Sequence, residues 1–259
     1  MSPEANKQHQ GGISYFSSEY GLVFDNVKSF EIVLGNGSVV TTSSDDNADL
    51  YKALRGGGSN FGIVTSYELY TYPTGTISMD ARAYSINQTD EFLQALAEYQ
   101  KRGQNDTKSS VTVQILPTGP TVLLLYAGTE LYPQAFAPFY DVKPYESLVE
   151  PSNNSSMMDV LNLSDSRFVT GDDVRVYGET FSHIADADLL IELFNIFINE
   201  TSGLPPNVTA TWVPNSISPN VAARGRARGG NILGLLELSQ VCMLNILSTH
   251  ILSHSLSLY

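Results

Sequence analysis

A run of three glycines, residues 56–58, constrains the fold of this 259-residue chain more than any other feature. Glycine loses more backbone freedom on folding than other residues, so such a run needs a structural reason. Residues 45–54 before it begin with aspartates and place Leu50 and Leu54 at helical spacing, which predicts a short capped helix. Residues 63–72 after it are β-branched and aromatic, which predicts a strand. The glycines form either a helix C-cap with a loop, or backbone that lies close to a ligand.

Two common nucleotide-binding motifs do not explain the run. A P-loop requires a lysine directly after its last glycine, and none is present here. A dinucleotide-binding fingerprint requires G-x-G-x-x-G between a strand and a following helix. Phe61 occupies the place of the third glycine, and the predicted order is helix then strand. Both motifs are therefore excluded.

The charge balance limits the partners of the chain. The net charge is −13, and an acidic chain repels nucleic acid and anionic membranes. Residues 224–230 form a single arginine–glycine cluster, and residues 231–259 are leucine-rich but interrupted by polar residues. We therefore expect no nucleic-acid partner and no membrane span.

Cysteine and histidine usage gives no metal site. The single cysteine, Cys242, cannot form an internal disulfide or a cysteine cluster. His250 and His254 have the i, i+4 spacing of a metal pair, but no further ligand is nearby in the sequence. We expect no metal.

The N-x-S/T sequon occurs eight times, which favours a secreted and glycosylated protein. The acceptor asparagines are Asn36, Asn87, Asn105, Asn153, Asn154, Asn162, Asn199 and Asn207. Residues 1–10, however, have no apolar core of a signal peptide. Either the sequons are unused in a cytosolic protein, or the true N-terminus is missing. We predict secretion for the full-length parent.

The pattern of periodicities predicts an α+β fold with a mainly antiparallel sheet. Gly35-Asn36-Gly37 is a hairpin turn between two short apolar runs, and residues 117–120 separate two more strands at 111–116 and 121–126. Helices are expected at residues 90–102 and 186–199, the second behind an Asp186 cap. Residues 150–158, PSNNSSMMD, are expected to form a surface loop.

Three segments together resemble one known family. They are GGISYFSSEYGLVFDNV at residues 11–27, the hairpin with GNGSVV, and DLYKALRGGGSNFGIVT at residues 49–65. This combination resembles the flavin-binding domain of the berberine bridge enzyme-like FAD-linked oxidoreductases, in the p-cresol methylhydroxylase (PCMH)/vanillyl-alcohol oxidase superfamily. The match covers residues 11–73 almost continuously, and residues 76–234 fit the family's substrate domain more loosely.

The resemblance implies a domain organisation. Residues 1–10 are a non-native or truncated start, and residues 11–75 are the second part of a PCMH-type FAD-binding domain. Residues 76–234 are a substrate-binding domain whose mainly antiparallel sheet is flanked by helices, and residues 235–259 are an atypical tail.

The resemblance also implies which residues contact FAD. Along the phosphates and ribitol it places Gly11, Gly12, Ser14, Ser17, Tyr20 and Gly21, with backbone N–H groups offered to the diphosphate. Against the pyrimidine end of the isoalloxazine it places the backbone amides of Gly62, Ile63 and Val64. The structural alternative is that these glycines only form tight turns.

By the same resemblance, the family oxidises an alcohol, sugar or secondary-metabolite substrate by hydride transfer to flavin N5, with molecular oxygen as acceptor. The family's histidine-bearing R-x-G-G-H-S loop and its C-terminal Asn-Tyr segment have no match in these residues. We therefore assign no catalytic residue and expect the sequence to be an internal fragment. The alternative is a non-catalytic remnant or small-molecule binding module, whose pocket would be lined by Tyr70, Tyr72, Tyr84, Tyr126 and Tyr177.

Overall fold

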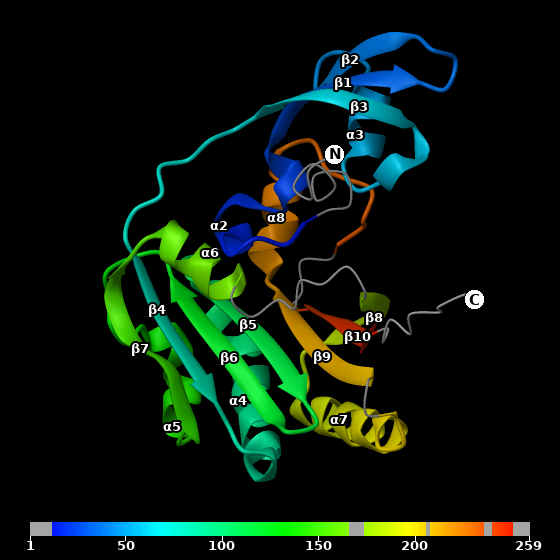
Figure 1. The fold of residues 1–259 in the computed structure, drawn as a ribbon. Coiled ribbons are helices and arrows are strands. Elements are labelled where there is room, and N and C mark those ends of the chain that lie inside the picture. The colour runs from blue at the N-terminus through cyan, green and yellow to red at the C-terminus, as the bar shows by residue number, and fades with distance from the viewer. Residues whose placement is uncertain (1–11, 166–173, 206–207, 236–239, 251–259) are drawn as a thin grey trace, which may run out of the picture. The chain divides into compact units, whose positions relative to one another are not determined.

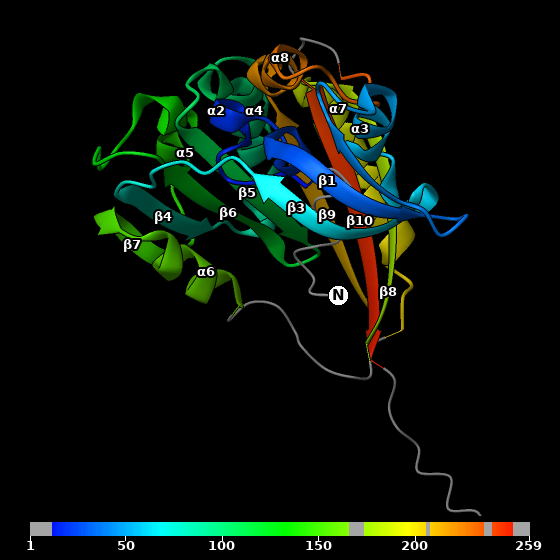
Figure 2. The ribbon, with the colours of Figure 1, turned by 90° about the horizontal axis from the view of Figure 1, so that it is seen from above.

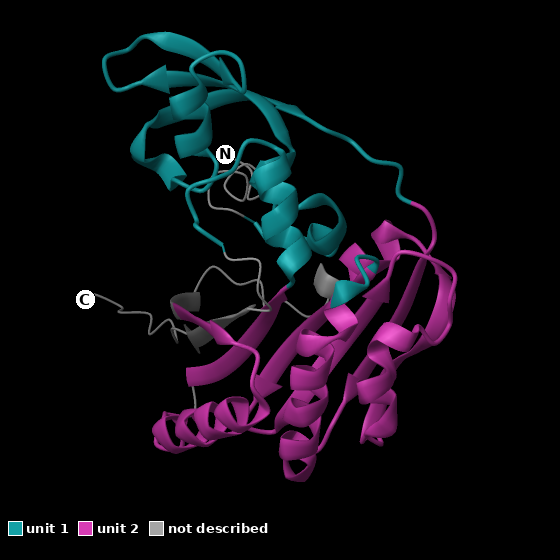
Figure 3. Cartoon of the chain, turned by 180° about the vertical axis from the view of Figure 1, so that it is seen from behind, with its two compact units in different colours: residues 1–74, 105–108, 218–238 teal, residues 75–104, 109–217, 239–259 magenta. Residues whose placement is uncertain are grey.

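The computed structural model describes residues 12–165, 174–205, 208–235 and 240–250 (Figures 1 and 2). The chain divides into two compact units (Figure 3). Unit 1 comprises Met1–Thr74, Asn105–Lys108 and Ser218–Leu238, and unit 2 comprises Gly75–Gln104, Ser109–Ile217 and Ser239–Tyr259. Residues 76–234 were expected to form one domain, whereas the contacts group Ser218–Leu238 with unit 1.

Unit 1 contains a three-stranded antiparallel sheet in the order β2-β1-β3. The strands are β1 (Val27–Leu34), β2 (Val39–Ser43) and β3 (Gly62–Leu69). The predicted hairpin is confirmed, because Gly37 turns the chain with a φ of 82° and its amide donates to Leu34 O at 2.9 Å. Phe30, Ile32 and Val64 bury one face of this sheet against α3.

The helices of unit 1 are short. They are α2 (Ser17–Tyr20), α3 (Ala48–Leu54) and α8 (Pro219–Ala227), with 3₁₀ turns at η1 (Val23–Asn26) and η2 (Gly58–Asn60). Asn47 precedes α3 with a φ of 48°, and its side chain forms no cap there. Its amide instead donates to Thr41 O in β2 at 2.8 Å, so it ties the helix start to the sheet.

Unit 2 is built on a seven-stranded sheet in the order β7-β4-β6-β5-β9-β10-β8 (Figure 1). All of its pairs are antiparallel, which confirms the predicted α+β class. The strands are β4 (Ile77–Ala83), β5 (Ser109–Leu116), β6 (Gly119–Tyr126), β7 (Glu146–Ser155), β8 (Val174–Ile184), β9 (Val208–Ile217) and β10 (Gln240–His250).

The helices of unit 2 are α4 (Thr89–Lys101), α5 (Ala137–Asp141), α6 (Met157–Asp165) and α7 (Ala187–Thr201), with 3₁₀ turns at η3 (Ile86–Gln88), η4 (Gly103–Asn105) and η5 (Gln134–Phe136). Helices α4, α5 and α7 pack on one face of the sheet, and α6 lies on the other side of its strands (Figure 2). Alternate strand residues such as Val113 and Leu124 meet Phe92 and Leu96 of α4 in one core. On the α7 side, Phe194 stacks on Trp212 with ring centroids 6.1 Å apart.

The predicted helices are confirmed at α4 and α7, and the predicted cap of α7 is present. Asp186 Oδ1 accepts a hydrogen bond from Leu189 N at 2.9 Å. Among the described residues, no helix is both long enough and apolar enough to cross a membrane.

Two expectations about irregular segments are wrong. The polar residues 150–158 do not form a surface loop, because they lie in the second half of β7 and the start of α6. The residues 235–259 are not only a tail, because Gln240–His250 forms β10 and pairs with β8 and β9 on its two sides. In both cases the strand is held by backbone pairing, which side-chain hydrophobicity does not report.

Candidate functional site

The predicted cofactor loop, residues 12–21 of unit 1, closes on itself. Gly11 lies outside the described residues. Ser17 Oγ accepts from Ser14 N at 2.8 Å, and Ser14 Oγ accepts from Phe16 N at 3.2 Å. The loop base is fixed by Val23 N, which donates to Gly12 O at 2.9 Å. Gly12 and Gly21 both have positive φ, 63° and 85°.

The amides assigned to the diphosphate already have acceptors inside this loop. Ser17 N donates to Ser14 O at 3.1 Å, Tyr20 N to Phe16 O at 2.9 Å, and Gly21 N to Ser17 O at 2.9 Å. The Ser14 amide donates to Ser17 Oγ. Four of the amides predicted to bind the diphosphate therefore donate to acceptors within the loop. These four amides therefore do not form a cradle of free donors around a diphosphate. Ile13, in the same loop, is half-exposed.

The three glycines of the 56–58 run each have a local reason. Gly56 has a φ of 108°, and a Cβ there would lie 3.2 Å from both Phe24 and Leu233. A Cβ on Gly57 would lie 2.2 Å from Ala53 O. Gly58 has a φ of 65° and open space around it. A tight turn that other segments of unit 1 cover explains the run without a ligand.

The residues predicted against the isoalloxazine begin strand β3. A Cβ on Gly62 would lie 2.2 Å from Val33 O in the neighbouring strand, so this glycine is required by strand packing. Val64 is buried in the core of unit 1, whereas the Ile63 side chain is 59% exposed. The surface that these three residues offer to a ligand is therefore Ile63 and the backbone beside it.

Unit 1 also contains a buried polar cluster that was not predicted from the sequence. Arg55 and Asp25 are both fully buried and form an ion pair, with Nη2 2.8 Å from Oδ1. Arg55 also donates to Phe24 O at 3.3 Å and to Arg228 O at 2.6 Å. Asn231 Nδ2 donates to Asp25 Oδ1 at 3.2 Å. The available sequence signal was an arginine and an aspartate within the apolar stretches 53–55 and 22–27.

The surroundings of Asp25 shift the pKa of its carboxyl in opposite directions. Burial raises the pKa of the Asp25 carboxyl, and Asn231, Arg55 and the amide of Leu22 act against that rise. Gly21 and Gly225 crowd the same carboxylate, because a Cβ on either residue would lie 3.0 Å from Asp25 Oδ2. The cluster therefore brings together three segments of unit 1 that are far apart in the sequence.

Unit 2 has its own ion pair on β4, in which Asp80 is buried and Arg82 is partly buried. Arg82 donates to Asp80 Oδ2 through Nε at 2.9 Å, and its Nη2 lies 2.8 Å from the same oxygen. Asp80 Oδ1 has no hydrogen-bond partner among the described residues, and burial raises the pKa of this carboxyl. The Arg82 guanidinium lies 4.8 Å from the centre of the Tyr140 ring. The pair packs under α5 as part of the helix-covered face.

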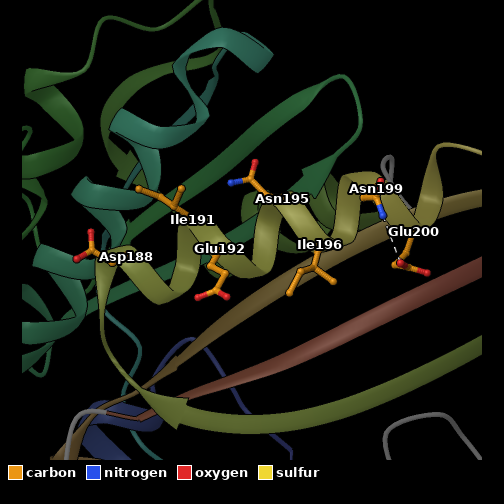
Figure 4. Close-up of a pocket in the computed structure, with 7 residues that line it drawn as sticks. All are labelled: Asp188, Ile191, Glu192, Asn195, Ile196, Asn199 and Glu200. Atoms are coloured by element: carbon orange, nitrogen blue, oxygen red, sulfur yellow. Dashed lines mark hydrogen bonds between the residues drawn. The ribbon is translucent and has the colours of Figure 1, made fainter.

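A hollow of about 480 Å³ lies along α7 (Figure 4). Its lining comes from this one helix: Asp188, Ile191, Glu192, Asn195, Ile196, Asn199 and Glu200. It contains no residue of the predicted site. An open hollow along a single helix, without a convergent set of polar groups, does not have the form of a small-molecule site.

The tyrosines of the alternative hypothesis do not line one pocket. Tyr84 and Tyr126 are buried in the core of unit 2, whereas Tyr70 and Tyr72 belong to unit 1. The Tyr177 side chain lies outside the described residues. In the part of the chain that the structure describes, no group of three or more histidine, cysteine or acidic side chains forms a metal site.

The fold is that of PCMH-type FAD-linked oxidases. A glucooligosaccharide oxidase of Acremonium strictum superposes with a TM-score of 0.78 over 98% of this chain and 56% of its own, at 17% identity. No protein-family model matches the chain.

Sequence relatives define the family more closely. An FAD-dependent monooxygenase of Arthrobotrys oligospora is 37% identical over 227 residues, covering 87% of this chain and 43% of the relative. A second, from Penicillium terrestre, is 35% identical over 233 residues, covering 89% and 44%. In sequence and fold the chain is similar to FAD-linked oxidoreductases, which confirms the resemblance. It spans less than half the length of the two sequence relatives.

Proposed function

We propose that this chain forms part of an FAD-dependent oxidoreductase that acts on a small-molecule substrate. The observation that carries the proposal is the 37% identity to an FAD-dependent monooxygenase across 227 residues, which include both units. A bound flavin would supply a hydride acceptor at N5 and pass electrons to molecular oxygen. The substrate class is an alcohol, a sugar or a secondary-metabolite intermediate.

The residues proposed to contact FAD lie in unit 1. The loop at residues 12–21 would contact the cofactor through its outer surface, since its amides donate internally. The start of β3 would do so through Ile63 and adjacent backbone. Each of these two contacts involves few residues. In an interface, most of the binding energy comes from a few central contacts.

The experiment compares flavin retention in two proteins. One is the 259-residue chain, and the other is a chimera that adds the parts of the Arthrobotrys oligospora relative outside the aligned region. Each is mixed with FAD, desalted and measured by visible absorbance. We expect stoichiometric flavin in the chimera and little in the chain alone, because the chain covers 43% of that relative. A colourless chimera contradicts the proposed function and favours a non-catalytic binding module or remnant.

We further propose secretion and N-glycosylation of the full-length parent. The seven sequon asparagines among the described residues are all exposed, as a glycan requires: Asn36, Asn87, Asn105, Asn153, Asn154, Asn162 and Asn199. The chain would be expressed behind a signal peptide in a glycosylating host and treated with a glycosidase. A fall in apparent mass supports the proposal, and an unchanged mass contradicts it.

A further inference from the structure

The Asn26 side chain connects the candidate loop to the segment that follows α8. Its Nδ2 donates to Tyr20 O at 3.1 Å and to Leu22 O at 2.9 Å. Its Oδ1 accepts from Tyr72 Oη at 2.9 Å and from Arg228 Nη1. All four hydrogen-bonding groups lie within unit 1, so the arrangement is internal to one compact body.

The orientation of this amide is forced by its neighbours. An arginine side chain only donates hydrogen bonds, and a backbone carbonyl only accepts them. Arg228 therefore requires the oxygen of the Asn26 amide on its side, and the Tyr20 and Leu22 carbonyls require the nitrogen on theirs. A flipped amide would lose its contacts at both ends.

Arg228 is itself well anchored. Its Nη1 donates to Asp25 O at 3.1 Å, and its own carbonyl accepts from the buried Arg55 at 2.6 Å. Its Nη2 contacts Tyr72 Oη. The Tyr72 ring stacks on Tyr20 with centroids 3.9 Å apart and planes 8° apart. Tyr20, at the end of the loop, is thus held in two ways. Its backbone carbonyl accepts a hydrogen bond from Asn26, and its ring stacks on the ring of Tyr72.

We propose that Asn26 is the positioning residue of the loop at residues 12–21, and that it transmits the position of Arg228 to that loop. The conformation of the loop then depends on a side chain 202 positions further along the chain from Asn26. That a cofactor is affected in turn rests on the proposed function. The positioning role itself rests only on the contacts described above.

The sharpest test is Asn26→Asp, which is nearly isosteric. The carboxylate keeps an acceptor for Arg228 and Tyr72 but turns an oxygen towards the carbonyls of Tyr20 and Leu22. Two hydrogen bonds are lost and replaced by repulsion. We expect amide hydrogen exchange at Ser17, Tyr20 and Gly21 to accelerate by roughly tenfold or more. The urea midpoint should stay close to that of the parent chain, because the new charge pairs with Arg228.

The matched control is Asn36→Asp in the exposed β1–β2 turn. There Asn36 acts as an acceptor for Ser38 N at 3.0 Å, which an aspartate preserves, so exchange in the loop should not change. Tyr72→Phe is a second variant, since it removes the hydroxyl and keeps the ring that stacks on Tyr20. We expect it to accelerate loop exchange by a smaller factor than Asn26→Asp.

The outcomes separate the two proposals. Loop exchange that is unchanged in both Asn26→Asp and Tyr72→Phe overturns the positioning role. So does Asn26→Asp unfolding the whole chain while Tyr72→Phe leaves the loop unchanged. In the flavin-binding chimera, Asn26→Asp should weaken FAD affinity by roughly tenfold if the loop contacts the cofactor. A chimera that retains no flavin, with exchange accelerated as expected, contradicts the proposed function and supports the positioning role.

Discussion

Replacing Arg55 by methionine should destabilise unit 1 severely. The guanidinium is fully buried and bonds to the Asp25 carboxylate and to two backbone carbonyls. Methionine fills much of the volume but leaves Asp25 buried, with Leu22 N and Asn231 as its remaining donors among the described residues. Removing one partner of a buried ion pair costs about 3–5 kcal/mol. Since whole domains are stable by about 5–15 kcal/mol, unit 1 should lose a large part of its stability.

The assay can report the two units separately. Trp212 is the single tryptophan and is buried in unit 2, so its fluorescence in urea follows that unit. Hydrogen exchange at β1 amides such as Ile32 follows unit 1. We expect the exchange free energy of β1 to fall by about 3–5 kcal/mol in Arg55→Met. If the exchange free energy of β1 falls by less than about 1 kcal/mol, the ion pair does not contribute substantially to the stability of unit 1.

Two further variants check the cause. Lys28→Met breaks the Lys28–Glu68 pair, in which both side chains are about half-exposed, and should have little effect. Asp25→Leu combined with Arg55→Met removes both charges, so the double variant should be less destabilised than the sum of the single ones. Rescue is expected to be partial, because the Phe24 and Arg228 carbonyls still lose their donor.

Three other outcomes are expected. Gly57→Val should lower the free energy of unfolding by about 1–3 kcal/mol, since a Cβ would lie 2.2 Å from Ala53 O, whereas Gly75→Val, with nothing within 4 Å, should not. Asp186→Ala should cost about 1 kcal/mol through loss of the α7 cap, and an unchanged midpoint would contradict that role. Burial raises the pKa of Tyr84 from 10.0 to about 12, so the unfolded state ionises first, and stability present below pH 10 should fall by roughly 2 kcal/mol towards pH 12. Unfolding titrations of the parent and Tyr84→Phe should diverge in that window, and parallel curves would refute the shift.

Local features of the fold were predictable because their causes lie within a few residues. The Gly35-Asn36-Gly37 turn fixes a hairpin through positive φ, and the apolar spacing of α4 and α7 places one face of each on a core. The Asp186 cap bonds to an amide three residues away. The family was also predictable, since its motif combines three local segments.

Only the tertiary structure decided what the motif residues do. Asp25 meets Arg55 across 30 positions, and Arg55 meets the Arg228 carbonyl across 173, distances over which sequence periodicity carries no information. The polar run at 152–155 joins an edge strand because its backbone pairs with β4, although its side chains do not call for a strand. The amides of the glycine loop were expected to face a diphosphate, yet closure of the loop around Ser14 and Ser17 gives them internal acceptors. Backbone hydrogen bonding and the burial of charge depend on which segments meet, and that is settled only when the chain is folded.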